Sequence, residues 1–289
     1  MALNLLNHRS EHEVFVHHRS RARVLDIITA GATWSPTPRD LASESRVIML
    51  MLPDLPQVEE VLDGPDGILA GVTGETLLVI SSTSSASGVR QLAKRVAIST
   101  NGMVSIVDAP VSGGEDGAIA GTLSILVGGA DADVERVMPV LATMGNPTHL
   151  GPLGSGEIAK FCNQLIVAST IMALGEAAVL AERSGLDLDA LFGVLDGGYA
   201  GSRVLETRRD RITSGEFGSS GLAKYMVKDL SFAHDEAVRS GTSAPQLELL
   251  LESFTDLTHR GFGDQDISVT RAYVQSRSES LDIPEEGKL

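Results

Sequence analysis

The sequence predicts an α/β domain built on a parallel sheet, followed by an all-α domain. Two observations lead to this prediction. In the first half of the 289 residues, short β-like apolar runs alternate with helical patterns, which is typical of parallel strands joined by crossover helices. After Gly156 the periodicity is helical, with almost no strand-like run. We place the boundary near Gly151, with a first domain at 1–150 and a second at 151–289.

The strands of the first domain are predicted from short apolar runs that end at turn-forming residues. The clearest run is 46–52, which is apolar over most of its length and is stopped by Pro53. Helical periodicity between the runs predicts crossover helices on the sheet. The expected strands are 13–17, 46–52, 76–81, 104–108 and 123–127, and the expected helices are 22–29, 87–97 and 131–144.

The helices of the second domain are divided by glycine-containing breaks. Glycine ends helices readily because it adopts backbone conformations that other residues avoid. The expected breaks are at 197–198, 215–221, 241–245 and 261–263. The polar tail at 278–289 is expected to be partly disordered.

Composition limits the classes of partner. A hydrophobic content of 43% suffices for a large core, and a net charge of −15 disfavours nucleic acid and anionic membranes as partners. Cys162 is the single cysteine, which excludes an intrachain disulfide and favours a reducing compartment; its expected role is packing in an apolar helix. We see no signal peptide, and Glu176 interrupts the longest apolar run, so we expect a soluble, cytoplasmic protein.

Lys160 is the most informative single residue. It opens the apolar segment 158–181, in which Glu176 is the only other charge. Burial of an unpaired ammonium is costly, so Lys160 is expected to be either well paired or catalytic. A desolvated lysine suits proton transfer to a carbonyl oxygen or from a hydroxyl. The alternative, about equally favoured, is a lysine that reaches along the helix to the surface.

Asn163 lies three residues after Lys160, a spacing that places both side chains on one helix face. The two can therefore converge on one small polar group. The approach to this helix contains Gly154 and Gly156.

Ser112, Gly113 and Gly114 follow a predicted strand that ends at Asp108. Such a turn exposes backbone N–H groups and a hydroxyl at the carboxyl end of a sheet, where α/β folds bind ligands. It could hold a carboxylate. An ordinary glycine-rich turn is the alternative, and the three residues alone favour it.

Two basic stretches suggest cofactor contacts. Arg19 and Arg21 follow the first visible strand, where arginine accommodates the additional phosphate of NADP and an acidic residue would instead hold a ribose hydroxyl. A basic surface turn explains them equally well. Lys228 and Asp229 form a second pair, which taken alone is most simply a solvated helix face.

The order and spacing of these motifs resemble the β-hydroxyacid dehydrogenase family, which includes 3-hydroxyisobutyrate dehydrogenases and 2-hydroxy-3-oxopropionate (tartronate semialdehyde) reductases. The resemblance covers nearly the whole chain. The matching stretches are 108–114 with 121–123, like the family's substrate-binding motif; 154–164, like its catalytic motif; 228–230, like its cofactor-side motif; and Leu52-Pro53-Asp54 with Ser82-Thr83, like two loops that border the nicotinamide.

The resemblance implies a Rossmann-like first domain, NADP or else NAD as cofactor, and hydride transfer to or from a small β-hydroxy acid or its semialdehyde. Lys160 would be the general acid and base. Position 164 is glutamine, where many members of the family have a second asparagine. Together with 197–202, this glutamine favours the 2-hydroxy-3-oxopropionate branch. The resemblance assigns the substrate carboxylate to Ser112, Gly113 and Gly114, orientation of the substrate or of Lys160 to Asn163, and cofactor contacts to Arg19, Leu52, Pro53, Thr83 and Lys228.

The start of the chain departs most from the family pattern. The family begins with a strand and a Gly-x-Gly-x-x-Gly turn, whereas residues 1–6 look like the helix that follows that turn. The resemblance therefore implies an N-terminally truncated first domain that lacks its first, central strand, with a gap between that strand's neighbours.

Alternatives to the enzyme remain. One is a catalytically impaired relative that acts only as a binding or oligomerisation protein. Another is an imine reductase, which Lys160 disfavours because such relatives generally lack that lysine. The long apolar helix after Gly156 suggests a homodimer or homotetramer.

Overall fold

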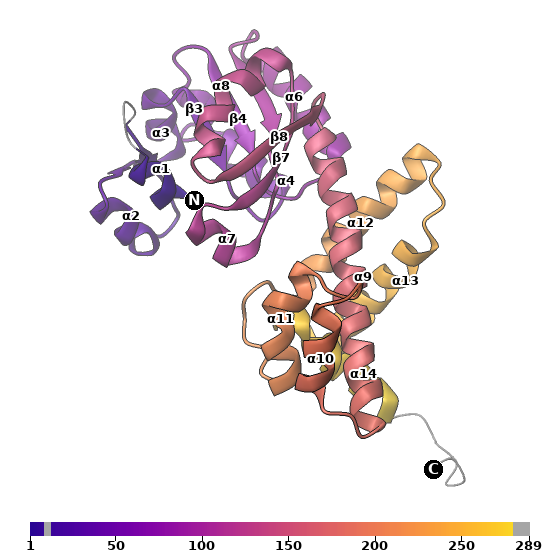
Figure 1. Ribbon diagram of the computed structural model, residues 1–289. Helices are drawn as coiled ribbons and strands as arrows, with labels where there is room; N and C mark the ends of the chain where they lie inside the picture. The colour runs from indigo at the N-terminus through magenta and orange to yellow at the C-terminus, as the bar shows by residue number, and fades with distance from the viewer. Residues whose placement is uncertain (9–12, 280–289) are drawn as a thin grey trace. The chain divides into compact units, whose positions relative to one another are not determined.

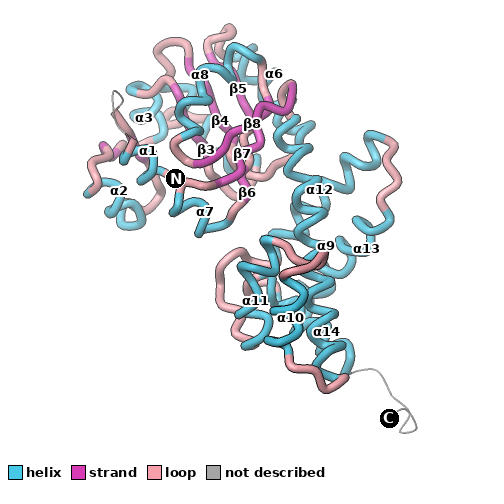
Figure 2. Tube along the Cα trace, viewed as in Figure 1, coloured by secondary structure: helices cyan, strands magenta, loops and turns pink. Residues whose placement is uncertain are grey.

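The computed structural model describes residues 1–8 and 13–279. The chain forms two compact units, Met1–Lys160 and Phe161–Leu289 (Figure 1). The strands belong to the first unit, and the second is built from helices (Figure 2). The expected fold class, a parallel-dominated α/β domain followed by an all-α domain, is confirmed. The polar tail that we expected to be disordered lies almost wholly outside the described residues.

The main sheet of the first unit has six strands. Three neighbouring strands are parallel, and the remaining three form a second group around β7, which pairs antiparallel with β5 and β6 and parallel with β8. The strand order is β3-β4-β5-β7-β6, with β8 beside β7. The strands are β3 (Val47–Leu50), β4 (Thr76–Ile80), β5 (Val104–Asp108), β6 (Val111–Ser112), β7 (Leu123–Gly128) and β8 (Gly145–Gly151).

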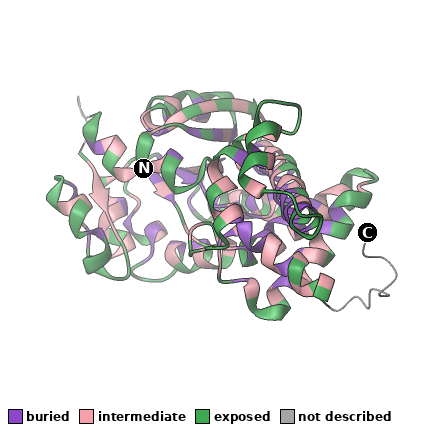
Figure 3. Cartoon of the chain, turned by 60° about the horizontal axis from the view of Figure 1, so that its bottom comes forward, coloured by how far each residue is buried: buried purple, intermediate pink, exposed green. Residues whose placement is uncertain are grey.

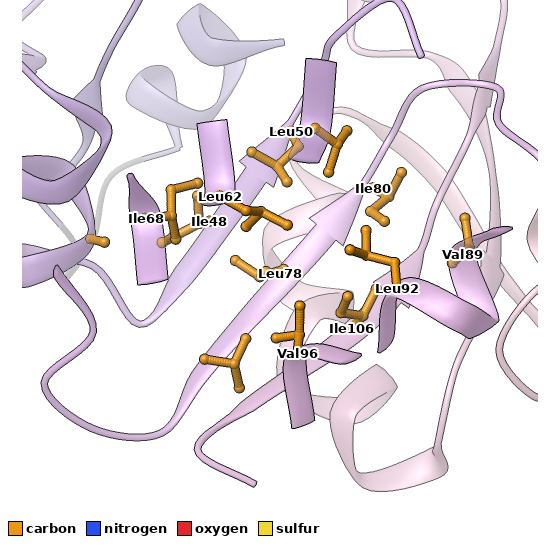
Figure 4. Packing of buried hydrophobic residues seen from close by; sticks show 13 residues of the cluster. Ile48, Leu50, Leu62, Ile68, Leu78, Ile80, Val89, Leu92, Val96 and Ile106 are labelled. Carbon is orange, nitrogen blue, oxygen red and sulfur yellow. The ribbon is translucent and has the colours of Figure 1, made fainter. Parts of the chain in front are cut away.

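Both faces of the sheet are covered, because alternate residues of each strand point to opposite sides. In β4, Leu78 and Ile80 join one hydrophobic core with helices α3 to α6 (Figure 4). Leu77 and Val79 join a second core with α8 on the other face. This arrangement explains why every residue of β4 is buried and why the run reads as continuously apolar.

A separate two-stranded sheet precedes the main one. It pairs β1 (Phe15–Val16) with β2 (Thr33–Trp34) in parallel. Among the described residues, these strands pair only with each other and not with β3. The helix expected at 22–29 is a 3-10 turn, Arg21–Val24, followed by α2 (Leu25–Thr29).

The helices of the first unit begin at side-chain caps in several cases. Thr37 accepts a hydrogen bond from the Asp40 amide at the start of α3, and Ser85 accepts one from the Gly88 amide at the start of α6. These helices are α1 (Ala2–Asn7), α3 (Pro38–Glu44), α4 (Leu55–Leu62), α5 (Ile68–Gly71), α6 (Ala86–Ser99), α7 (Gly114–Ala120) and α8 (Asp131–Ala142).

The second unit contains the expected helical breaks. Gly215 and Gly241 both adopt left-handed backbone conformations directly after a helix, as the sequence predicts. The described part of this unit has only an isolated bridge between Leu222 and Asp266 as β structure. Its helices are α10 (Leu188–Asp196), α11 (Arg203–Ser214), α12 (Lys224–Ser240), α13 (Pro245–Leu257) and α14 (Thr270–Glu279), with short turns of other helix types at Thr258–Phe262 and Ile267–Val269.

Helix α9 (Ser155–Arg183) is long and apolar. It is the one helix in the described residues with the length and composition of a membrane span, but half of its most apolar window is buried inside the protein. Figure 3 shows buried, intermediate and exposed residues interspersed along the helices. Cys162 lies on an exposed part of α9. The prediction that Cys162 packs in the interior is therefore wrong. Although α9 has apolar residues on most sides, one side of the helix is exposed, and Cys162 lies on that side.

Candidate active site

Three parallel strands have their carboxyl ends at the same level of the sheet. Leu50 of β3 pairs with Ile80 of β4, and Ile80 pairs with Asp108 of β5. In parallel α/β sheets, ligands bind at this edge. The loops that follow these strands carry several of the residues predicted for the site.

Two of these loops are bonded to each other. The Leu52 amide donates to Ser82 Oγ at 3.1 Å, so the loop after β3 is held against the loop after β4. Leu52 and Thr83 are half-buried and Pro53 is exposed. The sequence therefore correctly groups these residues at neighbouring strand ends, while their contact with a cofactor remains a prediction.

The Ser112-Gly113-Gly114 turn joins β6 to α7. Gly113 has φ 135° and Gly114 has φ 64°, which are conformations that favour glycine at both positions. Ser112 is half-buried and both glycines are exposed. Glu115 and Asp116 follow in the first turn of α7, so attraction of a carboxylate here would depend on N–H groups and the Ser112 hydroxyl rather than on net positive charge.

Lys160 lies in the second turn of α9 and is only 7% exposed. A lysine that reaches the surface would expose its ammonium, so this degree of burial does not fit the surface alternative. The expectation of a buried charge at the start of an apolar helix is confirmed.

Asp108 holds the start of α9. Its Oδ1 accepts from the Gly154 amide at 2.7 Å, and its Oδ2 accepts from the Glu157 amide at 2.8 Å. Burial raises the pKa of the Asp108 carboxyl, against the opposite effect of these N–H donors. Gly156 packs so closely that an added Cβ would lie 2.2 Å from the Leu126 carbonyl oxygen. The Gly154 and Gly156 spacing is thus a packing requirement of the helix that carries Lys160.

In the second unit, a hydrogen-bonded chain runs from Asn163 to Lys228. Asn163 Nδ2 donates to Gln164 Oε1 at 2.9 Å, and Gln164 Nε2 donates to Asp229 Oδ2 at 2.6 Å. Asp229 Oδ1 lies 3.5 Å from Lys228 Nζ. Gln164 and Asp229 are 7% and 6% exposed, so the bond between them is buried. This chain joins a predicted substrate residue on α9 to a predicted cofactor residue on α12.

The basic residues of the predicted cofactor site have different surroundings. Lys228 Nζ lies 5.5 Å from the centre of the Phe232 ring and is not simply solvated. Arg21 lies 5.9 Å from the Trp34 ring centre, and His17 stacks on the same ring at 5.6 Å. Arg19 is exposed.

Sequence reasoning missed three residues of these networks. Asp108 was included in the stretch 108–114 without a role of its own, Asp229 was read only as the partner of Lys228 on a solvated helix face, and Glu157 received no role. For Glu157 there was a signal, since an acidic residue one turn before a buried lysine in an apolar segment is unusual. Among the described residues, no group of His, Cys, Asp and Glu could hold a metal ion.

Two protein-family models match the chain. The model of the NAD binding domain of 6-phosphogluconate dehydrogenase matches residues 1–156. The model described as "NAD-binding of NADP-dependent 3-hydroxyisobutyrate dehydrogenase" matches residues 154–273. Together with the parallel sheet, these matches define a nicotinamide-dependent oxidoreductase.

Comparison with individual relatives identifies the family within this class of oxidoreductases. The 2-hydroxy-3-oxopropionate reductase of Escherichia coli is 37% identical over 272 residues, covering 93% of this chain and 90% of the relative. The NAD-dependent L-serine dehydrogenase of Pseudomonas aeruginosa is 31% identical, covering 94% and 92%. The chain belongs to the β-hydroxyacid dehydrogenase family, whose members transfer a hydride between NAD(P) and small β-hydroxy acids or their semialdehydes.

Solved structures have the same fold. The 3-hydroxyisobutyrate dehydrogenase of Salmonella typhimurium superposes with a TM-score of 0.84 at 24% identity, over 94% of both chains. The 3-hydroxyisobutyrate dehydrogenase of Mycobacterium tuberculosis, whose structure is named with L-serine, gives 0.78 at 27% identity, covering 95% of this chain and 94% of that one.

Proposed function

We propose that this chain reversibly transfers a hydride between NADP and a small β-hydroxy acid or its semialdehyde, with 2-hydroxy-3-oxopropionate as the first candidate substrate. The observation that carries the proposal is the burial of Lys160 on a helix anchored to the carboxyl end of β5. The identity to the Escherichia coli reductase supports the choice of substrate. The exposed Arg19, beside the first strand, supports NADP over NAD.

The side chains present fit a nicotinamide cofactor. Leu52 and Pro53 offer apolar surface for a ring, Thr83 offers a hydroxyl for an amide group, and Arg19 offers a guanidinium for a phosphate. When bound, the cofactor supplies or accepts the hydride. Lys228 is a further proposed cofactor contact.

The protein's own part in the reaction is proton transfer and orientation. In reduction, Lys160 Nζ donates a proton to the carbonyl oxygen of the substrate; in oxidation, it accepts the hydroxyl proton. Ser112 and the N–H groups of Gly113 and Gly114 hold the substrate carboxylate. Asn163, one helical turn after Lys160, orients the substrate, and its own amide is held by Gln164.

Replacement of the general acid is the direct test. Lys160→Ala is expected to lower kcat by about a hundredfold or more, while the affinity for NADPH, measured by fluorescence titration, changes little. Lys94→Ala, which removes an exposed lysine on α6, is the matched control and should have wild-type kinetics. Near-normal turnover in Lys160→Ala would contradict the assignment.

A substrate panel tests the specificity. We expect 2-hydroxy-3-oxopropionate to give the highest kcat/KM, above 3-hydroxyisobutyrate and L-serine, with NADP(H) preferred to NAD(H). L-serine belongs in the panel because one relative is named as an L-serine dehydrogenase and the structure of another is named with L-serine. Absence of turnover with all three substrates and both cofactors would refute the proposed function.

We also propose that the enzyme is a cytoplasmic homodimer or homotetramer. Apolar side chains on α9 support self-association, since Ile166 is 66% exposed and Leu180 is 70% exposed in the single chain. Light scattering on the purified protein would measure its mass, and a monomer at micromolar concentration would contradict the proposal.

A further inference from the structure

Glu157 is a buried acidic residue that the proposed reaction does not use. It lies in the first turn of α9 and is fully buried. Its Oε2 accepts from the Ser84 amide at 3.0 Å, a bond that is itself buried. Ser84 follows Thr83 in the loop after β4, which is the loop predicted to border the nicotinamide.

The backbone of Glu157 is held as well as its side chain. Its amide donates to Asp108 Oδ2, at the end of β5, while its carboxylate accepts from the loop after β4. Asp108 also accepts from the Gly154 amide, one residue before α9 begins. Three buried hydrogen bonds therefore join the ends of two neighbouring strands to a single helical turn.

The first turn of α9 determines the position of Lys160. Lys160 follows Glu157 by three residues on a continuous helix, so its position relative to the strand ends is fixed by the first turn. A helix start held at one strand end alone could still pivot about that attachment. Attachment at a second strand end, through the Glu157 carboxylate, prevents such a pivot.

We propose that Glu157 is a positioning residue that fixes the distance between the Ser82–Ser84 loop and the amine of Lys160. The proposal rests on the proposed function, in which that loop borders the nicotinamide and Lys160 transfers the proton. Reaction between hydride, carbonyl carbon and proton donor requires alignment to within a fraction of an ångström, so a helix that shifts on this scale loses turnover.

Two conservative substitutions at Glu157 test the reach of its side chain separately from its charge. Glu157→Gln keeps the length of the side chain and an oxygen that accepts from Ser84, so kcat should stay within about threefold of wild type. Glu157→Asp keeps the charge but is one methylene shorter and no longer reaches Ser84. We expect it to lower kcat about tenfold or more with little change in KM. Glu135→Gln, at an exposed position on α8, is the control.

Hydrogen exchange supplies a readout that does not depend on activity. The peptide that contains Ser84 should exchange faster in Glu157→Asp than in wild type, and at the wild-type rate in Glu157→Gln. Peptides from the opposite sheet face, around α8, should be unchanged in both variants. Faster exchange throughout the first unit would indicate general loss of stability and would overturn the proposal.

The results distinguish failure of the proposed function from failure of the positioning role of Glu157. An inactive wild type refutes the proposed function, and the exchange measurement then still decides whether Glu157 holds the loop. An active wild type with unchanged kcat in Glu157→Asp overturns the positioning role. So does a loss of kcat in Glu157→Gln with wild-type kcat in Glu157→Asp, because it would show that charge rather than reach is required.

Discussion

Gly156 gives the sharpest test of how α9 is attached to the sheet. In Gly156→Ala, the new Cβ would lie 2.2 Å from the Leu126 carbonyl oxygen and 2.9 Å from Asp108 Oδ2, where ordinary contacts begin at 3.4 Å. The first turn of α9 would have to move by about 1 Å to relieve the contact, because both obstacles belong to a packed strand edge. That movement would stretch the 2.8 Å bond between the Glu157 amide and Asp108 beyond hydrogen-bonding distance.

The expected cost follows from these two effects. Overpacking of this kind costs about 1–3 kcal/mol, and leaving the buried Glu157 amide without an acceptor costs about 1–3 kcal/mol. We therefore expect Gly156→Ala to lower the free energy of unfolding of the first unit by roughly 3 kcal/mol or more. Turnover should fall as well, since Lys160 lies on the displaced helix.

The assay is urea unfolding followed by tryptophan fluorescence. Trp34 is the only tryptophan in the chain and lies in the first unit, so the signal reports that unit. Gly74→Ala is the matched control, because it makes the same change in the first unit, where the nearest atoms lie at an ordinary 3.7 Å. It should be neutral or slightly stabilising, because alanine restricts the unfolded chain more than glycine does. A Gly156→Ala protein as stable as wild type would refute the reasoning.

Two further predictions concern buried carboxylates. Asp229→Leu should destabilise the second unit by about 1–3 kcal/mol, because Gln164 Nε2 loses its buried acceptor. Adding Gln164→Leu should recover part of this stability, as measured by urea unfolding followed by circular dichroism. No recovery in the double variant would argue against the pairing of Gln164 with Asp229. Asp108 has a raised pKa in the folded state, mainly because it is buried, so its contribution to stability is present below the unfolded pKa of about 3.9 and is lost as pH rises through the folded pKa. The stability of wild type relative to Asp108→Asn should therefore fall as pH rises above about 4. A difference that grows with pH would show that the charged form is the stabilised one.

Much of the fold is predictable because local composition and tertiary context agree. Strand β5 was predicted with its observed bounds, 104–108, since it is a β-branched run with turn residues on both sides. Strand β8 was missed because Gly145, Asn146 and Pro147 are disfavoured in strands, and pairing with β7 overrides that preference. The two-residue strands β2 and β6 are too short to show any periodicity.

The site was predicted less completely, and for a different reason. The burial of Lys160 follows from one charge in an apolar run, which is a local signal. The partners of Asp108 lie 46 and 49 residues away, and Gln164 bonds to Asp229 across 65 residues. Periodicity carries no information about such distant pairs. The departure at Gln164 was noticed, but its reason, a side chain long enough to reach from α9 to α12, needs the structure.

The level ends of β3, β4 and β5 have a consequence for how this scaffold can change in evolution. Because Leu50, Ile80 and Asp108 are paired in register, the loops after them start from fixed points whatever their sequences. Substitutions at Thr83 or Ser112 can alter the chemistry presented at this edge without moving the strands beneath it. A lineage of such enzymes can thus acquire a new small hydroxy acid as substrate through loop residues alone, while the attachment of α9 is inherited unchanged.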